Sequence, residues 1–267
     1  VNRNSARTQW HDGLLFSLCG YLLEAGIMFN LEDRGVFASV APPDYWRQTP
    51  SAAMRIVPDL TVREADGTPT PGNLRLYDVK TISDCASRYK VTWIDGRHAK
   101  KPVEERASKV HGEYLKHCQV FDEQLCQTAQ GTTGPFAQRL AEFGQVRGLV
   151  FGHYGECSEA VRDLVDRIAA QIAHKTGLRE GARSIKDATA AQKHRLYKSL
   201  SILSHRERAR LVLTGLQFVG SGSASAGIDR EIHNRRSRFD SRRAAYREQT
   251  AGGPYANFQN HRPGGGG

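Results

Sequence analysis

Residues 55–82, RIVPDLTVREADGTPTPGNLRLYDVKTI, decide the fold of this chain. Two runs rich in Val, Leu and Ile flank residues 65–73, whose Gly, Pro, Asp and Asn content is typical of a turn. The pattern predicts a β-hairpin with a loose loop, and the apolar character of both runs predicts an interior place in a sheet. Asp59, Asp78 and Lys80 interrupt these runs, and burying their charges is unfavourable unless a partner compensates them.

The three charged residues form a pattern that suits phosphodiester hydrolysis. Because side chains alternate along a strand, Asp78 and Lys80 are expected on the same face. Mg²⁺ prefers oxygen ligands, which Asp59, Asp78 and the carbonyl of Val79 could supply, and Mn²⁺ could replace it. Lys80 could contact the scissile phosphate and position, or help deprotonate, the attacking water. These residues therefore predict a metal-dependent phosphodiesterase.

The rest of the chain predicts helices around this hairpin. Apolar residues at three- and four-residue steps favour helices at 8–29, 102–127, 158–177 and 188–219. In the second of these helices the expected apolar stripe is Ala107, Val110, Tyr114, Cys118, Phe121 and Leu125. One irregular strand is expected after the first helix, and glycines bound a buried strand within 144–156. This order of elements predicts an α/β fold in which helices flank a mixed central sheet. The expected domains are a core at 1–177, a basic helical extension at 178–220, and a flexible Arg-rich and Gly-rich tail at 221–267.

Composition narrows the class of protein and of partner. The 267 residues hold no apolar stretch long enough to cross a membrane. Five widely spaced cysteines without a C-x-x-C pair argue against a disulfide framework and a zinc ribbon. They favour an intracellular location, where thiols stay reduced. If the source is eukaryotic, we expect the nucleus. His111, Cys118 and Cys126 likewise lack the tight pairs of zinc sites, so Cys118 is expected in the core. The first residue is Val rather than Met, as expected of a fragment or one domain of a polyprotein.

The net charge is concentrated at one end of the chain. Residues 1–175 carry 21 Lys and Arg against 21 Asp and Glu, while residues 176–267 carry 17 against 7, so the last third holds the whole net charge of +10. A neutral body with a basic extension predicts a polyanionic partner, and we expect nucleic acid. In segment 230–247, Arg235, Arg236, Arg242 and Arg243 are the candidate nucleic-acid contacts. The alternative is a solvated tail that binds nothing.

A family resemblance is carried by the hairpin. Pro58-Asp59, eighteen intervening residues and Asp78-Val79-Lys80 resemble the PD-(D/E)XK motif of the restriction-endonuclease-like nucleases. The element order over about residues 8–175 is also similar to that superfamily's core of helix, three-strand meander, helix and strand. The resemblance implies that Asp59 and Asp78 are metal ligands and that Lys80 is the catalytic lysine. It also implies a further acid on the first helix, where this chain has Glu24. In layout alone, the strand within 144–156 and the basic helix resemble nuclease-like reading frames of eukaryotic mobile elements.

Other interpretations remain open at this point. The hairpin could lie at the surface, with Asp59 in a turn and Lys80 in solvent. A second hypothesis is a noncatalytic nucleic-acid-binding module of a mobile-element or viral polyprotein, and a third is a scaffold with a basic tail. DNA is the expected substrate, while RNA, endonuclease or exonuclease action, the number of metal ions and the oligomeric state are left open.

Overall fold

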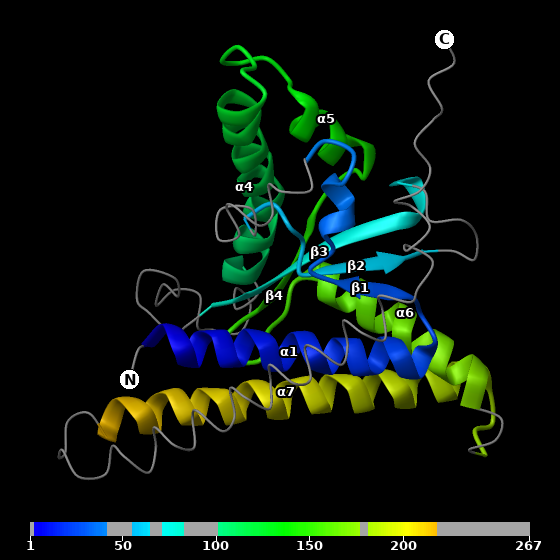
Figure 1. Ribbon diagram of the computed structural model, residues 1–267. Coiled ribbons are helices and arrows are strands. Elements are labelled where there is room, and N and C mark those ends of the chain that lie inside the picture. The colour runs from blue at the N-terminus through cyan, green and yellow to red at the C-terminus, as the bar shows by residue number, and fades with distance from the viewer. Residues whose placement is uncertain (1–2, 42–54, 65–70, 83–100, 177–180, 218–267) are drawn as a thin grey trace. The chain divides into compact units, whose positions relative to one another are not determined.

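The computed structural model describes residues 3–41, 55–64, 71–82, 101–176 and 181–217. Within these ranges the chain is an α/β protein with a mixed four-stranded sheet, which confirms the predicted class (Figure 1). The candidate contacts Arg235, Arg236, Arg242 and Arg243 lie outside the described residues, so their role stays a prediction.

The described elements agree with most of those predicted from periodicity. The helices are α1 (Arg3–Ala25), α4 (Lys101–Leu125), α5 (Pro135–Glu142), α6 (Glu159–Thr176) and α7 (Ile185–Gln217), with short 3₁₀ helices η1 (Arg34–Phe37) and η2 (Pro71–Asn73). The strands are β1 (Phe29–Leu31), β2 (Leu60–Arg63), β3 (Leu74–Thr81) and β4 (Arg147–Phe151). All four predicted helices and the strand within 144–156 are confirmed. Helix α5 falls where the sequence pattern predicts no element.

The predicted hairpin is present as an antiparallel pair in the sheet. The strand order is β1-β2-β3-β4, so β3 is an interior strand as predicted. Strands β1 and β2 are antiparallel, with Asn30 opposite Thr61, and β2 and β3 are antiparallel, with Leu60 opposite Tyr77. Interior strands have both edges hydrogen-bonded, which suits a site that must hold its side chains at fixed positions.

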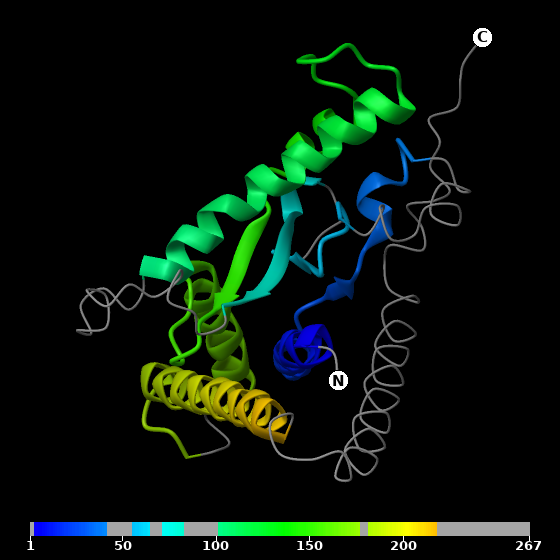
Figure 2. The ribbon, with the colours of Figure 1, turned by 90° about the vertical axis from the view of Figure 1, so that its left-hand side faces the viewer.

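The chain divides into two compact units, the second of which holds most of the hairpin. This unit contains β1, β2, the first five residues of β3, α5 and most of α4. The stripe on α4 predicted from the sequence packs onto Leu74 and Leu76 of β3 and onto Phe136 of α5. Figure 2 shows α4, in green, lying alongside β3, in cyan. The core cluster contains Val36, Phe37, Ala41, Ile56, Leu74, Leu76, Val110, Tyr114, Cys118, Phe121, Phe136, Ala137, Leu140, Phe143 and Val146.

The other unit is built largely from three helices. Helices α1, α6 and α7 pack against one another, and Trp10, Leu14, Leu18 and Leu22 bury one stripe of α1. Glu24 near the end of α1 pairs with Arg195 near the start of α7, so the two helices run antiparallel (Figure 1). The predicted basic extension at 178–220 thus contains a helix that packs on the first helix of the chain. In the described part of the chain, no helix has the length and apolarity needed to span a membrane.

Candidate nuclease site

The strand register brings Asp59 and Asp78 together. Leu60, the first residue of β2, lies opposite Tyr77 of β3, so Asp59 just before β2 and Asp78 on β3 both adjoin this pair. Asp59 continues the ladder on its other side, where its carbonyl accepts a hydrogen bond from the backbone N–H of Glu32 at 3.1 Å. Continuing this register by one residue would pair the two acids on one sheet face, where opposite Cβ atoms lie about 4.5–5.5 Å apart. The charges of both carboxylates act on Tyr114, so the two acids lie near the same side chain.

Tyr114 of α4 lies against both acid-bearing segments. Its hydroxyl donates to Asp78 Oδ1 at 2.8 Å and approaches the carbonyl oxygen of Val57 at 3.1 Å. Burial, followed by the negative charges of Asp78 and Asp59, raises the pKa of Tyr114 well above its ordinary value. The phenol thus stays protonated and acts as a donor. The sequence pattern placed Tyr114 in the apolar stripe, and nothing in the pattern shows which acceptor its hydroxyl meets.

Lys80 follows Asp78 on the same strand. Asp78 is buried, with 3 % of its surface exposed, whereas Lys80 two residues later is half-buried. Strand alternation directs both side chains to one face of β3, and Val79 between them is fully buried on the other. The ammonium group can therefore remain partly hydrated while its stem crosses the strand surface.

The sheet face that carries the two acids also carries other buried polar side chains. Thr61 and Arg63 alternate with Leu60 and Val62 on β2, so they share the face of Asp59, and Asn30 lies opposite Thr61. Thr61 is fully buried, and its hydroxyl has no hydrogen-bond partner among the described residues. The alternation DLTVR at 59–63 is visible in the sequence and could have identified this polar face.

These side chains fit a hard divalent cation in donor chemistry. The carboxylates of Asp59 and Asp78, and the Val79 carbonyl that follows on β3, are the kind of oxygen ligands that Mg²⁺ prefers, with water and substrate phosphate completing its shell. A cation would also offset the repulsion between the two carboxylates, of which Asp78 is buried and Asp59 half-buried. No cluster of three or more His, Cys, Asp and Glu side chains suitable for a metal occurs within the described ranges.

Glu24, the further acid implied by the resemblance, forms an ion pair with a residue of another helix. It is an exposed residue of α1, and Arg195 Nη2 of α7 lies 2.6 Å from its Oε1. This ion pair is at the surface, where such pairs contribute little to stability. The role of Glu24 as a site acid stays a prediction.

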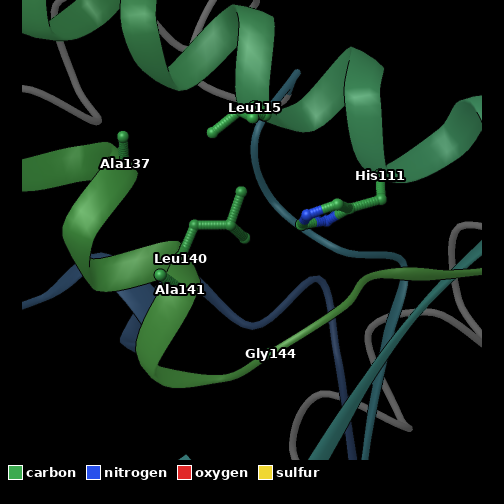
Figure 3. A pocket seen from close by; sticks show the side chains of 6 residues that line it. All are labelled: His111, Leu115, Ala137, Leu140, Ala141 and Gly144. Atoms are coloured by element: carbon green, nitrogen blue, oxygen red, sulfur yellow. The ribbon is translucent and has the colours of Figure 1, made fainter. Parts of the chain in front are cut away.

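A pocket of about 330 Å³ between α4 and α5 has a different character (Figure 3). Among the side chains that line it, only that of His111 is polar. The Nδ1 atom of His111 lies 3.4 Å from the backbone nitrogen of Val146. Burial lowers the pKa of His111, so the imidazole is neutral at pH 7 and accepts this bond. A single neutral imidazole among Leu and Ala side chains offers little to a phosphodiester. The lining residues are His111, Leu115, Ala137, Leu140, Ala141 and Gly144.

The thiols provide a check on how α4 is packed. Cys118 is fully buried in the core cluster, and burial raises its pKa to about 12, as expected of a neutral core thiol, whereas Cys126 is exposed. At pH 8 we expect a maleimide to modify Cys126. The buried thiols of Cys118 and Cys19 should react at a rate at least about tenfold lower. Peptide mass spectrometry identifies the modified residues, with guanidinium-unfolded protein as the control. Equal modification of Cys118 and Cys126 in the folded protein would contradict this packing.

The geometry thus places Asp59 and Asp78 beside the Leu60–Tyr77 pair, puts Lys80 on the same strand face as Asp78, and pairs Glu24 with Arg195. Tyr114, Thr61, Asn30 and Arg63 were not predicted as part of this site. Comparison of the chain with protein-family models, with curated proteins and with solved structures finds no match.

Proposed function

We propose that this chain is a metal-dependent nuclease that hydrolyses phosphodiester bonds in DNA, using Asp59, Asp78 and Lys80. The observation that carries the proposal is that Asp59 and Asp78 adjoin the paired residues Leu60 and Tyr77 of neighbouring antiparallel strands and that both act on Tyr114. The element order around them is a helix, three antiparallel-paired strands, the helices α4 and α5, and a strand; apart from the additional α5, this order supports the proposed resemblance to a restriction-endonuclease-like core.

Each residue has a defined task in this proposal. Asp59, Asp78 and the Val79 carbonyl would hold Mg²⁺, or Mn²⁺ in its place. When bound, the ion supplies a Lewis acid at the phosphate and lowers the pKa of a coordinated water. Lys80, on the same strand face as Asp78, contacts a non-bridging phosphate oxygen and offsets the negative charge that develops there during attack. The same ammonium group would orient the attacking water, and only its neutral amine form could instead accept that water's proton.

The basic last third of the chain would supply affinity for the nucleic-acid backbone. Residues 176–267 carry the whole net charge of +10, and the exposed residues Lys186, Lys198 and Arg206 of α7 belong to this third. Cationic side chains bind phosphates without regard to sequence, and this binding weakens steeply as salt rises. Arg235, Arg236, Arg242 and Arg243 are proposed to contribute to the same binding.

The test is cleavage of supercoiled plasmid by the purified chain with Mg²⁺, Mn²⁺ or EDTA. We expect nicking with either metal, none with EDTA, and a rate about 100-fold lower for Lys80→Ala, since positioned proton transfer and charge stabilisation contribute on that order. The matched control is Lys109→Ala, which removes an exposed lysine of α4 and should leave the rate unchanged. Cleavage that persists in EDTA, or a Lys80→Ala rate equal to that of the parent, would refute the assignment.

The charge distribution also favours a second candidate, a noncatalytic nucleic-acid-binding module. This candidate predicts salt-sensitive DNA binding that Asp78→Ala leaves unchanged, together with no cleavage under any metal. Gel-shift titrations at several salt concentrations, run beside the nicking assay, separate the two functions.

A further inference from the structure

One hydroxyl group contacts both segments that carry the proposed metal ligands. Tyr114 Oη lies 2.8 Å from Oδ1 of Asp78 on β3 and 3.1 Å from the carbonyl oxygen of Val57, which precedes Asp59 by two residues. We propose that Tyr114 is a positioning residue, whose hydroxyl sets the separation and orientation of the Asp59 and Asp78 carboxylates and thereby the affinity of this pair for a divalent cation. This inference rests on the proposed function, because it concerns the same two acids.

The hydroxyl can set positions because Tyr114 itself is fixed. It is 5 % exposed and belongs to the core cluster, in which Val110 one turn earlier and Cys118 one turn later on α4 are fully buried. Helix α4 spans 25 residues, from Lys101 to Leu125. A ring packed in this core has few accessible rotamers, so its oxygen occupies a defined point relative to the strands.

Each of the two contacts restrains a different degree of freedom. Donation to Asp78 Oδ1 restrains rotation of that carboxylate about its Cβ–Cγ bond, a torsion that is otherwise broad. The contact with Val57 restrains the segment just before β2, which begins at Leu60 and leaves Asp59 at the strand end. A phenol has a single proton, so the two acceptors share it: Asp78 Oδ1, charged and at the shorter distance, takes the stronger part and the Val57 carbonyl the weaker part.

A cation site of two carboxylates depends on such restraint. Hydrogen-bond partners that orient metal-binding side chains typically change metal affinity 10–100-fold when removed. Without the hydroxyl, the Asp78 carboxylate must be fixed in one orientation when the cation binds. The segment that carries Asp59 also loses a restraint on its position. The expected loss is therefore in metal affinity, and the reaction should recover when the metal is raised to saturation.

The experiment compares Tyr114→Phe with Tyr77→Phe in the full chain. Tyr77 is a buried tyrosine adjacent to Asp78, but it projects from the opposite face of β3, so it controls for the general effect of deleting a buried hydroxyl. Calorimetry with Mg²⁺ or Mn²⁺ alone measures the Kd, thermal unfolding in EDTA measures stability, and plasmid nicking is titrated with Mg²⁺. If Tyr114→Phe does not fold, Tyr114→Met removes the same donor and takes its place.

For Tyr114→Phe we expect a Kd raised about tenfold and half-maximal nicking at about tenfold more Mg²⁺, with the rate at saturation close to that of the parent. Tyr77→Phe should leave the Kd unchanged. A lower Tm with an unchanged Kd would assign Tyr114 a purely structural role and overturn the inference, even in a parent that cuts DNA. Weakened metal binding in a chain that cuts no nucleic acid would refute the nuclease and leave the inference about Tyr114 standing. A parent that binds no metal refutes both.

Discussion

Asp78→Asn is expected to lower the metal-dependent cleavage rate about a thousandfold. The substitution keeps the shape of the side chain and an oxygen that can still accept the Tyr114 hydroxyl, but it removes the negative charge. Loss of a metal ligand removes several kcal/mol of transition-state stabilisation, and about 4 kcal/mol corresponds to three powers of ten in rate. Single-turnover nicking at saturating Mg²⁺ measures the effect.

Two comparisons make the Asp78 result specific. Glu113→Gln removes an exposed acid from α4, one residue from Tyr114, and should cleave at the parent rate. The double variant Asp59→Asn/Asp78→Asn should be little slower than Asp78→Asn alone, because two ligands of one ion act as a unit and their effects do not add. An Asp78→Asn chain that cleaves within threefold of the parent would remove Asp78 from the site, and additive losses would separate the two acids.

The hairpin could be predicted because its signal is local. Turn residues lie between two β-rich runs, and strand alternation then fixes which side chains share a face, so the common face of Asp78 and Lys80 follows from sequence alone. The register does not follow, because the long loop between Arg63 and Leu74 permits several pairings. That Leu60 pairs with Tyr77, which brings Asp59 and Asp78 to neighbouring positions, is therefore information that only the structure supplies.

Helix α4 shows which features helical periodicity in the sequence can and cannot predict. Its spacing correctly predicts the stripe of Val110, Tyr114, Cys118 and Phe121, but it also predicts Leu125 in this stripe, and Leu125 is 48 % exposed. Leu125 is the last residue of the helix and is absent from the core cluster. Periodicity likewise cannot tell which charged residue of a helix finds a buried partner, because that partner lies on a segment distant in sequence.

Asp122 is such a residue, and its carboxylate holds the start of the helix that the sequence did not predict. It is 1 % exposed on α4 and accepts hydrogen bonds from the backbone N–H groups of Phe136 at 2.7 Å and Ala137 at 3.0 Å, in the first turn of α5. The first N–H groups of a helix lack partners within the helix, and a negative charge there is favoured by the helix dipole. Gly134 permits this approach, since a Cβ at that position would lie 2.4 Å from the carboxylate carbon.

Asp122→Ala is expected to lower the free energy of unfolding by about 4 kcal/mol, because two buried N–H groups lose a charged acceptor worth about 1.5–3 kcal/mol each. Urea unfolding followed by circular dichroism measures the change. Asp122→Asn keeps one acceptor oxygen, so its loss should be about half as large. Glu123→Ala, at the neighbouring exposed acid of α4, should stay within about 0.5 kcal/mol of the parent. Equal stabilities for Asp122→Ala and Glu123→Ala would show that α5 does not depend on this carboxylate, and the support that Phe136 gives to the core around Tyr114 would then have to come from packing alone.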